Sequence, residues 1–300
     1  MKNGRIFAGF LSAALAVSMM APASFAGETE AAGTEAASAN ADGLATEGRF
    51  VVGFDAEYPP YGYMDDNGDY TGFDLELAQA VCDLEGWELV KTPIDWDSKD
   101  MELNSGNIDC IWNGFTMNGR EDSYTFSVPY VNNSQVIVTA DDSGIDKLED
   151  LAGKTVGVQA DSAALDLLSE GGDQADLAAT FGDLQQFADY NTAFTELMAG
   201  SLDAVAIDIG VAQYQLNGRE GYKILDEYLN AEQYAVGFRK GNTALRDIVN
   251  KDLKTLLDNG TFDQIAEKYA GQGVDPTMLC LKESFGEAST EAETEAQTEA

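Results

Sequence analysis

Residues 109–120 are Asp109-Cys110-Ile111-Trp112-Asn113-Gly114-Phe115-Thr116-Met117-Asn118-Gly119-Arg120. The apolar residues Cys110 to Trp112 predict a short buried strand, and a polar loop with Gly114, Thr116 and Arg120 follows it. A glycine lets a backbone approach a ligand closely, and a guanidinium can bind a carboxylate through two parallel hydrogen bonds. An arginine after a strand is more often part of a surface salt bridge, so this loop alone does not establish a binding site.

The chain carries a second copy of this unit. Glu102 to Ile111 align with Glu196 to Val205 at one constant offset, with Glu, Leu, Gly and Asp in the same columns. Each copy predicts a helix closed by a glycine, a one-turn connection and an apolar strand. A looser match pairs Arg49-Phe50-Val51 with Lys154-Thr155-Val156, each at the start of a strand. Two similar α/β units predict two lobes related by duplication.

The two copies end in opposite charges. In open α/β sheets, ligands bind beyond the carboxyl ends of the strands. In the first copy that position is the loop from Gly114 to Arg120, and in the second it is Asp208, after the strand at 204–207. One lobe therefore offers a cation and the other an anion, and a zwitterion between them would satisfy both.

The composition excludes several classes of function. The absence of histidine rules out Ser-His-Asp and Cys-His catalysis and histidine metal ligands. Cys82, Cys110 and Cys280 show no CxxC or CxxH spacing, so we expect no metal and no cofactor. Cys82 and Cys110 are predicted to be buried thiols, with a disulfide between them as the less favoured alternative. A net charge of −36 argues against nucleic acids and anionic membrane surfaces as partners.

Both ends of the chain look separate from the folded part. Residues 1–26 combine Lys2 and Arg5, a short apolar run and Ser24-Phe25-Ala26, which predicts a secretory signal peptide cleaved after Ala26. Because no other segment is as apolar, we expect an exported, extracytoplasmic protein. The signal segment has no cysteine near its end, so we do not expect lipid attachment. Residues 27–48 and 281–300 are acidic and rich in Glu, Ala and Thr, which predicts disordered spacers.

The pattern between these ends predicts two lobes joined by two strands. Strands are expected at 49–54 and 89–94, and strands that cross between the lobes near 134–139 and 232–238. Lobe 1 is then 49–135 with 235–280, lobe 2 is 136–234, and a two-strand hinge permits closure around a ligand. Helices are predicted over 163–168, from 189 to a stop at Gly200, over 243–257, and from Thr261, where Gln264 would complete a capping box. An apolar helix stripe is formed by Phe73, Leu77, Ala80, Val81 and Leu84.

Four local patterns allow two interpretations each. The run Asp65 to Asp69 favours a hairpin turn over a calcium loop, because it lacks the EF-hand glycine and distal glutamate. Tyr61 and Tyr63 are predicted to pack on their own lobe. Trp96 is predicted either as core or as a lid over a ligand. Ser162 is predicted as an ordinary N-cap, with carboxylate binding as the alternative.

Taken together, these motifs resemble the type II solute-binding proteins that serve amino-acid ABC importers (extracellular solute-binding protein family 3). The resemblance covers about residues 49–271. The motifs are Asp55-x-x-Tyr58-x-Pro60-Tyr61, Gly72-Phe73-Asp74-Leu75, Asp95-Trp96, Gly106-x-x-Asp109, Gly114-Phe115-Thr116, Arg120, Phe126-Ser127-x-Pro129-Tyr130, Leu151-x-Gly153-Lys154-x-Val156-Gly157-Val158 and Asp203-Ala204-Val205-x-x-Asp208.

The resemblance implies a role for each matching position. Arg120 would hold a ligand α-carboxylate, helped by Thr116 and by N–H groups at Ser162 and Ala163. Asp208 would take the α-ammonium beside the Gly114 carbonyl. Tyr58 and Trp96 would sandwich the ligand side chain, and Asp55 and Gln159 would meet its polar end. Asn113 and Phe115 of the loop are also expected among the ligand-binding residues. Asp161 stands where the family usually has glycine, so its carboxylate is expected to point away.

The predicted function is a non-catalytic receptor. It would close on a free L-amino acid, with a polar or basic side chain favoured, and deliver it as a monomer to an ABC permease. One alternative is an enzyme similar to cyclohexadienyl dehydratase on the same scaffold. Another is a surface sensor or scaffold protein with the acidic tails as spacers.

Overall fold

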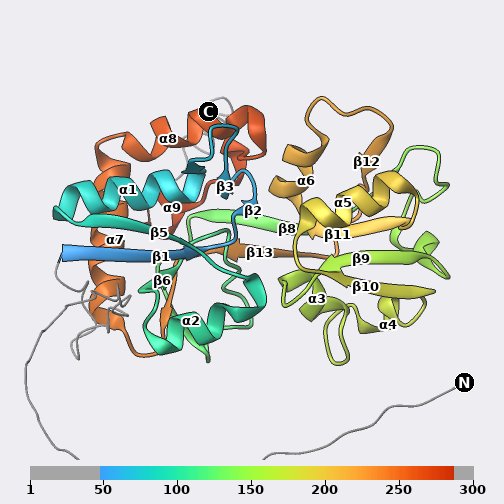
Figure 1. Ribbon diagram of the computed structural model, residues 1–300, viewed down its shortest axis with the longest axis horizontal. Coiled ribbons are helices and arrows are strands. Elements are labelled where there is room, and N and C mark those ends of the chain that lie inside the picture. The colour runs from blue at the N-terminus through green and yellow to red at the C-terminus, as the bar shows by residue number, and fades with distance from the viewer. Residues whose placement is uncertain (1–47, 287–300) are drawn as a thin grey trace, which may run out of the picture. The chain divides into compact units, whose positions relative to one another are not determined.

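A five-stranded sheet forms the centre of lobe 1 in the computed structural model, which describes residues 48–286 (Figure 1). Its strand order is β5 (Glu88–Pro93), β1 (Arg49–Phe54), β6 (Cys110–Ile111), β14 (Gly237–Arg239) and β7 (Tyr124–Phe126). β1 runs parallel to both β5 and β6, and β14 is antiparallel to β6 and β7. The helices of this lobe are α1 (Phe73–Glu85), α2 (Lys99–Ser105), α7 (Thr243–Asp258), α8 (Thr261–Tyr269) and α9 (Leu281–Ser284). Figure 1 shows α1 and α8 above the sheet and α2 below it.

Lobe 2 is built on a six-stranded sheet. Its strands are β10 (Asp183–Phe187), β9 (Thr155–Gln159), β11 (Ala204–Asp208), β8 (Val131–Ala140) and β12 (Tyr222–Ile224), with β13 (Asn230–Tyr234) also paired to β8. Its helices are α3 (Ala163–Leu168), α4 (Ala175–Ala178), α5 (Tyr190–Ala199) and α6 (Ile209–Leu216). Figure 1 shows α5 and α6 on one face of this sheet and α3 and α4 on the other.

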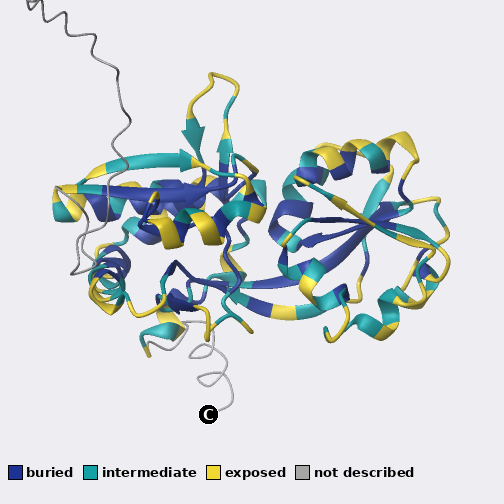
Figure 2. Cartoon of the chain, turned by 60° about the horizontal axis from the view of Figure 1, so that its bottom comes forward, coloured by how far each residue is buried: buried dark blue, intermediate teal, exposed yellow. Residues whose placement is uncertain are grey.

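Short elements complete the fold. A three-stranded sheet is made of β2 (Glu57–Tyr58), β3 (Gly62–Met64) and β4 (Tyr70–Thr71). The 3-10 helices are η2 (Trp96–Ser98), η3 (Leu148–Leu151), η4 (Ala270–Gln272) and η5 (Pro276–Met278). Figure 2 shows the buried residues concentrated along the strands of the two large sheets and the exposed residues on outer helix faces and in loops.

Two antiparallel strands connect the lobes, as the sequence predicts. The chain leaves lobe 1 after β7 through β8 and returns through β13 to β14, with Val131 opposite Tyr234. The predicted returning strand at 232–238 is interrupted, because β13 ends at Tyr234 and β14 begins at Gly237. The architecture is therefore two α/β lobes joined by a two-strand hinge, which is the predicted fold class.

The two copies seen in the sequence have the same local structure. α2 ends at Gly106 and α5 at Gly200, both left-handed, with φ of 83° and 77°. Asp109 and Asp203 then take equivalent places: the N–H of Val51 donates to Asp109 Oδ2 at 2.7 Å, and the N–H of Thr155 donates to Asp203 Oδ2 at 2.8 Å. The predicted duplication is thus present in the hydrogen bonds as well as in the sequence.

The looser match, which aligned Val51 with Val156 in the first strands of the two copies, is displaced by one residue. Val52 lies opposite Cys110 and Val156 lies opposite Ala204, so β1 and β9 correspond as Val52 to Val156. The physical marker of this register is glycine. A Cβ at Gly53 would lie 2.4 Å from Ile108 Cδ1, and one at Gly157 would lie 2.5 Å from Leu202 Cδ1.

Three other sequence predictions need correction. Leu84 of the α1 stripe is 43% exposed, because the buried face of α1 turns away before its last turn. The capping box at Thr261 does not form, because the N-cap is Gly260, which has no side chain. Helix α9 lies in the segment predicted as a disordered tail, and its Leu281 is fully buried.

Several other predictions are confirmed. α3 and α7 begin at the predicted residues, and α5 begins directly after its N-cap Asp189. The Asp65 run is a turn between β3 and β4, in which Asp65 Oδ1 accepts the N–H groups of Asn67 and Asp69 at 2.9 Å. Cys82 and Cys110 are buried free thiols, as predicted, and Cys280 is a third one. The predicted signal peptide and the residues 27–47 and 287–300 lie outside the described part of the chain.

Candidate functional site

A small cavity lies where the predicted binding residues converge. Its volume is about 10 Å³. It is lined by Tyr58, Trp96, Gly114, Thr116, Arg120, Gln159, Ser162, Ala163 and Asp208. All nine belong to the set expected from the sequence, and they come from both lobes. Because this volume corresponds to about one water molecule, an amino acid could enter only if side chains moved or the lobes separated.

The other three predicted residues adjoin this cavity. Asp55 Oδ2 accepts a hydrogen bond from Gln159 Nε2 at 2.7 Å. Asn113 Oδ1 accepts the N–H of Asp55 at 2.9 Å, and the Phe115 ring lies 5.2 Å from the Arg120 guanidinium carbon. The structure therefore brings all twelve predicted residues together.

Arg120 reaches across to lobe 2. Its Nη2 donates to Asp166 Oδ2 on α3 at 2.7 Å, and its Nη1 donates to the Thr116 carbonyl at 3.4 Å. The Asp166 side chain is 62% exposed, whereas that of Arg120 is 14% exposed. Nothing in the sequence marks Asp166, because its proximity to Arg120 depends on how α3 faces the loop of the other lobe.

Asp208 is the anionic end of the cavity. It is buried at the end of β11, and its Oδ1 accepts hydrogen bonds from Tyr234 Oη at 2.6 Å and from Asn133 Nδ2 and Gln135 Nε2 at 2.7 Å. Burial raises the pKa of Asp208 above its usual value, and these hydrogen bonds act in the opposite direction.

A second buried carboxylate, Glu232, lies beside Asp208. Its Oε1 accepts hydrogen bonds from Thr116 Oγ1 at 2.7 Å, Asn133 Nδ2 at 2.8 Å and Gln135 Nε2 at 2.9 Å. Burial raises the pKa of Glu232, and the charge of Asp208 raises it further. The sequence analysis missed this residue. The period-2 alternation of β13, which puts Glu232 and Tyr234 on one face, could have indicated it.

Aromatic rings close the site on several sides. Trp96 is buried against Phe115, with ring centroids 5.7 Å apart, and also lines the cavity, so it serves both as core and as wall. Tyr58 lies 6.0 Å from Tyr190 between ring centroids. Its hydroxyl is 3.4 Å from that of Tyr234. Tyr190 and Tyr234 were not predicted.

Tyr61 packs on its own lobe, as predicted, with its ring 6.4 Å from that of Phe73 on α1. Contacts with lobe 2, which were not predicted, accompany this packing. The Tyr63 ring lies 5.8 Å from that of Tyr214 on α6. A Cβ at Gly210, also on α6, would lie 2.4 Å from the Tyr61 hydroxyl. Both tyrosines therefore extend to lobe 2, because the hairpin that carries them lies at the lobe boundary.

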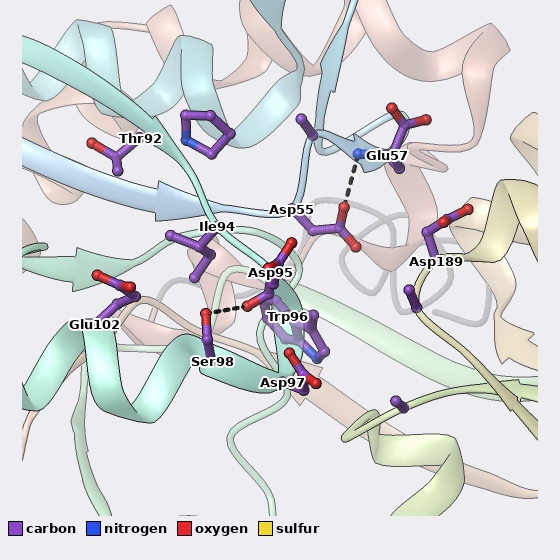
Figure 3. A pocket seen from close by; sticks show the side chains of 14 residues that line it. Asp55, Glu57, Thr92, Ile94, Asp95, Trp96, Asp97, Ser98, Glu102 and Asp189 are labelled. Carbon is purple, nitrogen blue, oxygen red and sulfur yellow. Dashed lines mark hydrogen bonds between the residues drawn. The ribbon is translucent and has the colours of Figure 1, made fainter. Parts of the chain in front are cut away.

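A larger acidic cavity adjoins the small one. Its volume is about 700 Å³. Its lining includes six carboxylates, from Asp55, Glu57, Asp95, Asp97, Glu102 and Asp189, together with Trp96. Figure 3 shows the Asp55 carboxylate accepting the N–H of Glu57, with Asp189 approaching from another element. Burial raises the pKa of Asp55 to about 6. The Asp55–Gln159 hydrogen bond joins the linings of the two cavities, since Asp55 lines the larger one and Gln159 the smaller one.

Asp161 is held by a buried lysine. Lys99 Nζ donates to the Asp161 carboxylate and, at 3.2 Å, to the Asp161 carbonyl. Lys99 lies on α2 of lobe 1, and its Nζ is 5.0 Å from the Trp96 ring centroid. Asp161 has a φ of 56°, a conformation that suits glycine. Its charge is therefore neutralised by Lys99, and it does not stand free against a ligand carboxylate.

Metal-ligating clusters and membrane-spanning helices are both absent from the part of the chain that the structure describes. Between residues 48 and 286, no group of three or more His, Cys, Asp or Glu side chains could hold a metal ion. No helix in the same range is both long and apolar enough to cross a membrane.

Comparison with known proteins gives consistent matches. A model of the bacterial extracellular solute-binding proteins, family 3, matches residues 50–272. The L-cystine-binding protein TcyJ of Escherichia coli (strain K12) is 29% identical over 231 residues, which is 76% of this chain and 84% of that protein. The arginine-binding extracellular protein ArtP of Bacillus subtilis (strain 168) is 30% identical, over 79% of this chain and 91% of that protein.

Solved structures match over the same range. An ABC uptake transporter substrate binding protein from Streptococcus pneumoniae with bound histidine has a TM-score of 0.72 and 34% identity, covering 75% of this chain and 94% of that one. The ancestral amino-acid-binding protein AncCDT-1, a precursor of cyclohexadienyl dehydratase, has a TM-score of 0.67 and 30% identity, covering 74% and 95% of the two chains.

Proposed function

The chain belongs to the bacterial extracellular solute-binding proteins, family 3, and from that membership we propose that it is an extracytoplasmic receptor that binds a free L-amino acid and delivers it to an ABC permease. The observation that carries the proposal is that Arg120 of lobe 1 and Asp208 of lobe 2 line one cavity. A guanidinium and a carboxylate on opposite walls match the two charges of an amino acid. Closure of the lobes around the ligand would bring both charges into place at once.

The remaining cavity residues fit the rest of such a ligand. N–H groups at Ser162 and Ala163 would assist Arg120 at the α-carboxylate. The Gly114 carbonyl would accept from the α-ammonium beside Asp208. Tyr58 and Trp96 would enclose the first carbons of the side chain. The ligand would bind to a monomer, since both charges come from one chain.

The acidic cavity favours a cationic side chain. A ligand that displaces the Asp55–Gln159 hydrogen bond would extend from the small cavity into the space lined by six carboxylates. Unlike charges attract most strongly where water is partly excluded. We therefore expect an amino acid with a basic side chain to bind more tightly than an acidic or apolar one of similar length.

Calorimetric titration with the common L-amino acids tests this function. We expect a basic amino acid to rank first, and Arg120→Ala and Asp208→Asn to weaken its binding by roughly 30- to 5,000-fold, because each leaves a buried charge without its partner. Arg219→Ala and Asp176→Asn change the same charges at exposed positions away from the cavity and serve as controls. Binding like that of wild type in either site variant, with unchanged circular dichroism, would reject the site.

An enzyme remains a second candidate because Asp55 is a buried carboxyl with a pKa of about 6 beside the cavity. Such a group can donate a proton near neutral pH. The enzyme would convert prephenate or arogenate, which absorbance assays detect directly. Turnover by the purified protein would replace the receptor proposal, and binding of a partner protein without any response to amino acids would favour a sensor or scaffold.

A further inference from the structure

A buried lysine joins the two lobes outside both cavities. Lys99 is the first residue of α2 in lobe 1, and its side chain is 3% exposed. Its Nζ donates to the carboxylate and to the carbonyl of Asp161, which lies between β9 and α3 in lobe 2. Neither residue lines the small cavity or the larger acidic one. A ligand can therefore occupy these cavities without displacing the ion pair, whereas it competes with Asp166 for Arg120.

Lobe 1 alone gives the charge of Lys99 little support. The helix dipole opposes a positive charge in the first turn of a helix, and burial lowers the pKa of Lys99. Among residues 48–286, both hydrogen-bond acceptors of its Nζ belong to Asp161, whose hydrogen bond and charge act on this pKa in the opposite direction. The Trp96 ring, 5.0 Å away, and the charge of Asp100 add weaker attraction from lobe 1. Since the main partner of the ammonium group belongs to lobe 2, the pair favours the form in which the lobes are together.

Asp161 is held in a conformation that is rare for its residue type. It is the single non-glycine residue with a positive φ among residues 48–286. This backbone region is disfavoured once a Cβ is present, and it persists where surrounding contacts determine it. The two hydrogen bonds from Lys99 hold both the side chain and the main chain of Asp161. Its neighbours Ala160 and Ser162 line the larger and the smaller cavity, so the pair fixes the turn that joins the two linings in lobe 2.

We infer that Lys99 and Asp161 form a latch, an ion pair between the lobes that stabilises the closed form of the protein whether or not a ligand is bound. While the unliganded protein is mainly open, a latch raises ligand affinity, because apparent affinity follows the population of the form that binds. The pair acts on closure alone, so its contribution is the same for every ligand that the closed form encloses. This inference goes beyond the proposed function, since closure can be measured without any ligand.

Energy transfer between two dyes measures closure in the unliganded protein. Met64→Cys in lobe 1 and Met198→Cys in lobe 2 supply the attachment sites, because both methionines are exposed whereas the three native cysteines are buried. We expect Lys99→Met, which keeps the apolar stem of the side chain, to lower the ratio of closed to open molecules by roughly tenfold. Asp161→Gly, which suits a φ of 56°, should lower it by a similar factor. Lys268→Met breaks an ion pair within lobe 1 and is the control.

Calorimetry with two probes separates a latch from a direct contact with the ligand. The probes are L-arginine and agmatine, which lacks the α-carboxylate. A latch predicts that Lys99→Met weakens both probes by the same factor, roughly tenfold. It also predicts that Lys99→Met combined with Asp161→Gly weakens them no further than either change alone, because both changes remove one interaction. A loss confined to L-arginine would show that Lys99 acts on the ligand carboxylate, and it would overturn the inference.

The latch can be decided even if the proposed function fails. If the wild-type protein binds no amino acid, the receptor proposal is rejected, and energy transfer in the unliganded protein still decides the latch. Should another amino acid rank above L-arginine, that amino acid and its decarboxylated analogue replace the probes. If Lys99→Met does not fold, Asp161→Gly decides alone. Closed populations and affinities like those of wild type in both variants overturn the inference.

Discussion

Arg120 Nη2 lies 2.7 Å from Asp166 Oδ2, so the guanidinium proposed to hold a ligand carboxylate already holds a carboxylate of the other lobe. A ligand must compete with Asp166 for the same donor. We therefore predict that Asp166→Asn raises the affinity for L-arginine. Because Asp166 is mostly exposed, such a pair contributes only about 0.2–1 kcal/mol, which limits the gain to roughly fivefold.

Calorimetry at low and high salt checks this prediction. The gain should shrink in high salt, since ions screen an exposed pair. Asp176→Asn, on α4, changes the same charge away from Arg120 and should leave affinity unchanged. A weaker ligand affinity in Asp166→Asn would mean that the pair supports binding instead of competing with it.

Gly114 is required at the cavity for two separate reasons. Its φ is 55°, and a Cβ there would lie 2.9 Å from Tyr58 Cε1 and 3.1 Å from Tyr234 Cε2. Gly119 has a similar φ of 78° but no atom within 4 Å of its Cβ position. We predict that both alanine variants lose about 1 kcal/mol of stability through backbone strain, and that Gly114→Ala alone loses ligand affinity. Thermal unfolding and calorimetry on the Gly114→Ala and Gly119→Ala variants measure the two effects. Equal ligand affinities would show that Tyr58 and Tyr234 move to accommodate the added methyl group without weakening binding.

Asp74 fixes the loop that carries Gly114 and makes stability depend on pH. Its Oδ2 accepts the Gly114 N–H at 2.6 Å and the Tyr130 hydroxyl at 2.9 Å, and burial raises its pKa from 3.8 to about 7. A raised pKa stabilises the folded state below pH 4, and this contribution is lost as pH rises through about 7. Asparagine does not ionise, so between pH 4 and pH 8 stability should shift in favour of Asp74→Asn by roughly 3–4 kcal/mol relative to wild type.

Thermal unfolding of both proteins across that range measures the shift for Asp74. Other titrating groups are common to both proteins and cancel in the difference. A constant difference in melting temperature from pH 4 to pH 8 would contradict a raised pKa at this position.

Gly157 and Leu202 should be coupled in a double-mutant cycle. Leu202→Ala should cost about 2–5 kcal/mol because Leu202 is buried. Gly157→Ala should also destabilise, since its Cβ would lie 2.5 Å from Leu202 Cδ1, but it should cost less when Leu202 is already alanine. We expect a coupling free energy of roughly 0.5–3 kcal/mol from urea denaturation, and a similar one for Gly53 and Ile108 in the other lobe. Additive effects at either pair would show that the leucine or isoleucine simply moves aside.

Much of this architecture could be predicted because short local sequence patterns determine where its helices and strands end. Gly106 and Gly200 close their helices in the conformation that glycine favours, and each closure precedes an aspartate and a strand. The proposed ligand-binding residues Arg120 and Asp208 lie in the loop after β6 and at the end of β11, so the general rule for ligands at strand ends locates them. A structural feature can be predicted from local sequence when the contacts that determine it join residues only a few positions apart.

The residues that were missed depend on contacts between distant segments. Glu232 becomes a partner of Thr116 only because β13 runs beside β8, and Asp166 becomes a partner of Arg120 only because the lobes face each other. The error of one residue between β1 and β9 has a similar cause. The correct register is set by how Gly53 and Gly157 receive side chains from other segments, and a comparison of the strands alone does not contain that information.

The burial of Lys99 beneath Asp161 gives the protein a natural chemical reporter. Its side chain is 3% exposed, whereas that of Lys251 is 68% exposed. A water-soluble acetylating reagent can reach Lys99 only while α2 and the Asp161 loop are apart, but it can reach Lys251 at any time. The ratio of acetylation at Lys99 to that at Lys251, measured by mass spectrometry, would therefore report how often the lobes of the unlabelled protein separate. The decrease of this ratio on adding ligand would report how strongly the ligand stabilises the closed form.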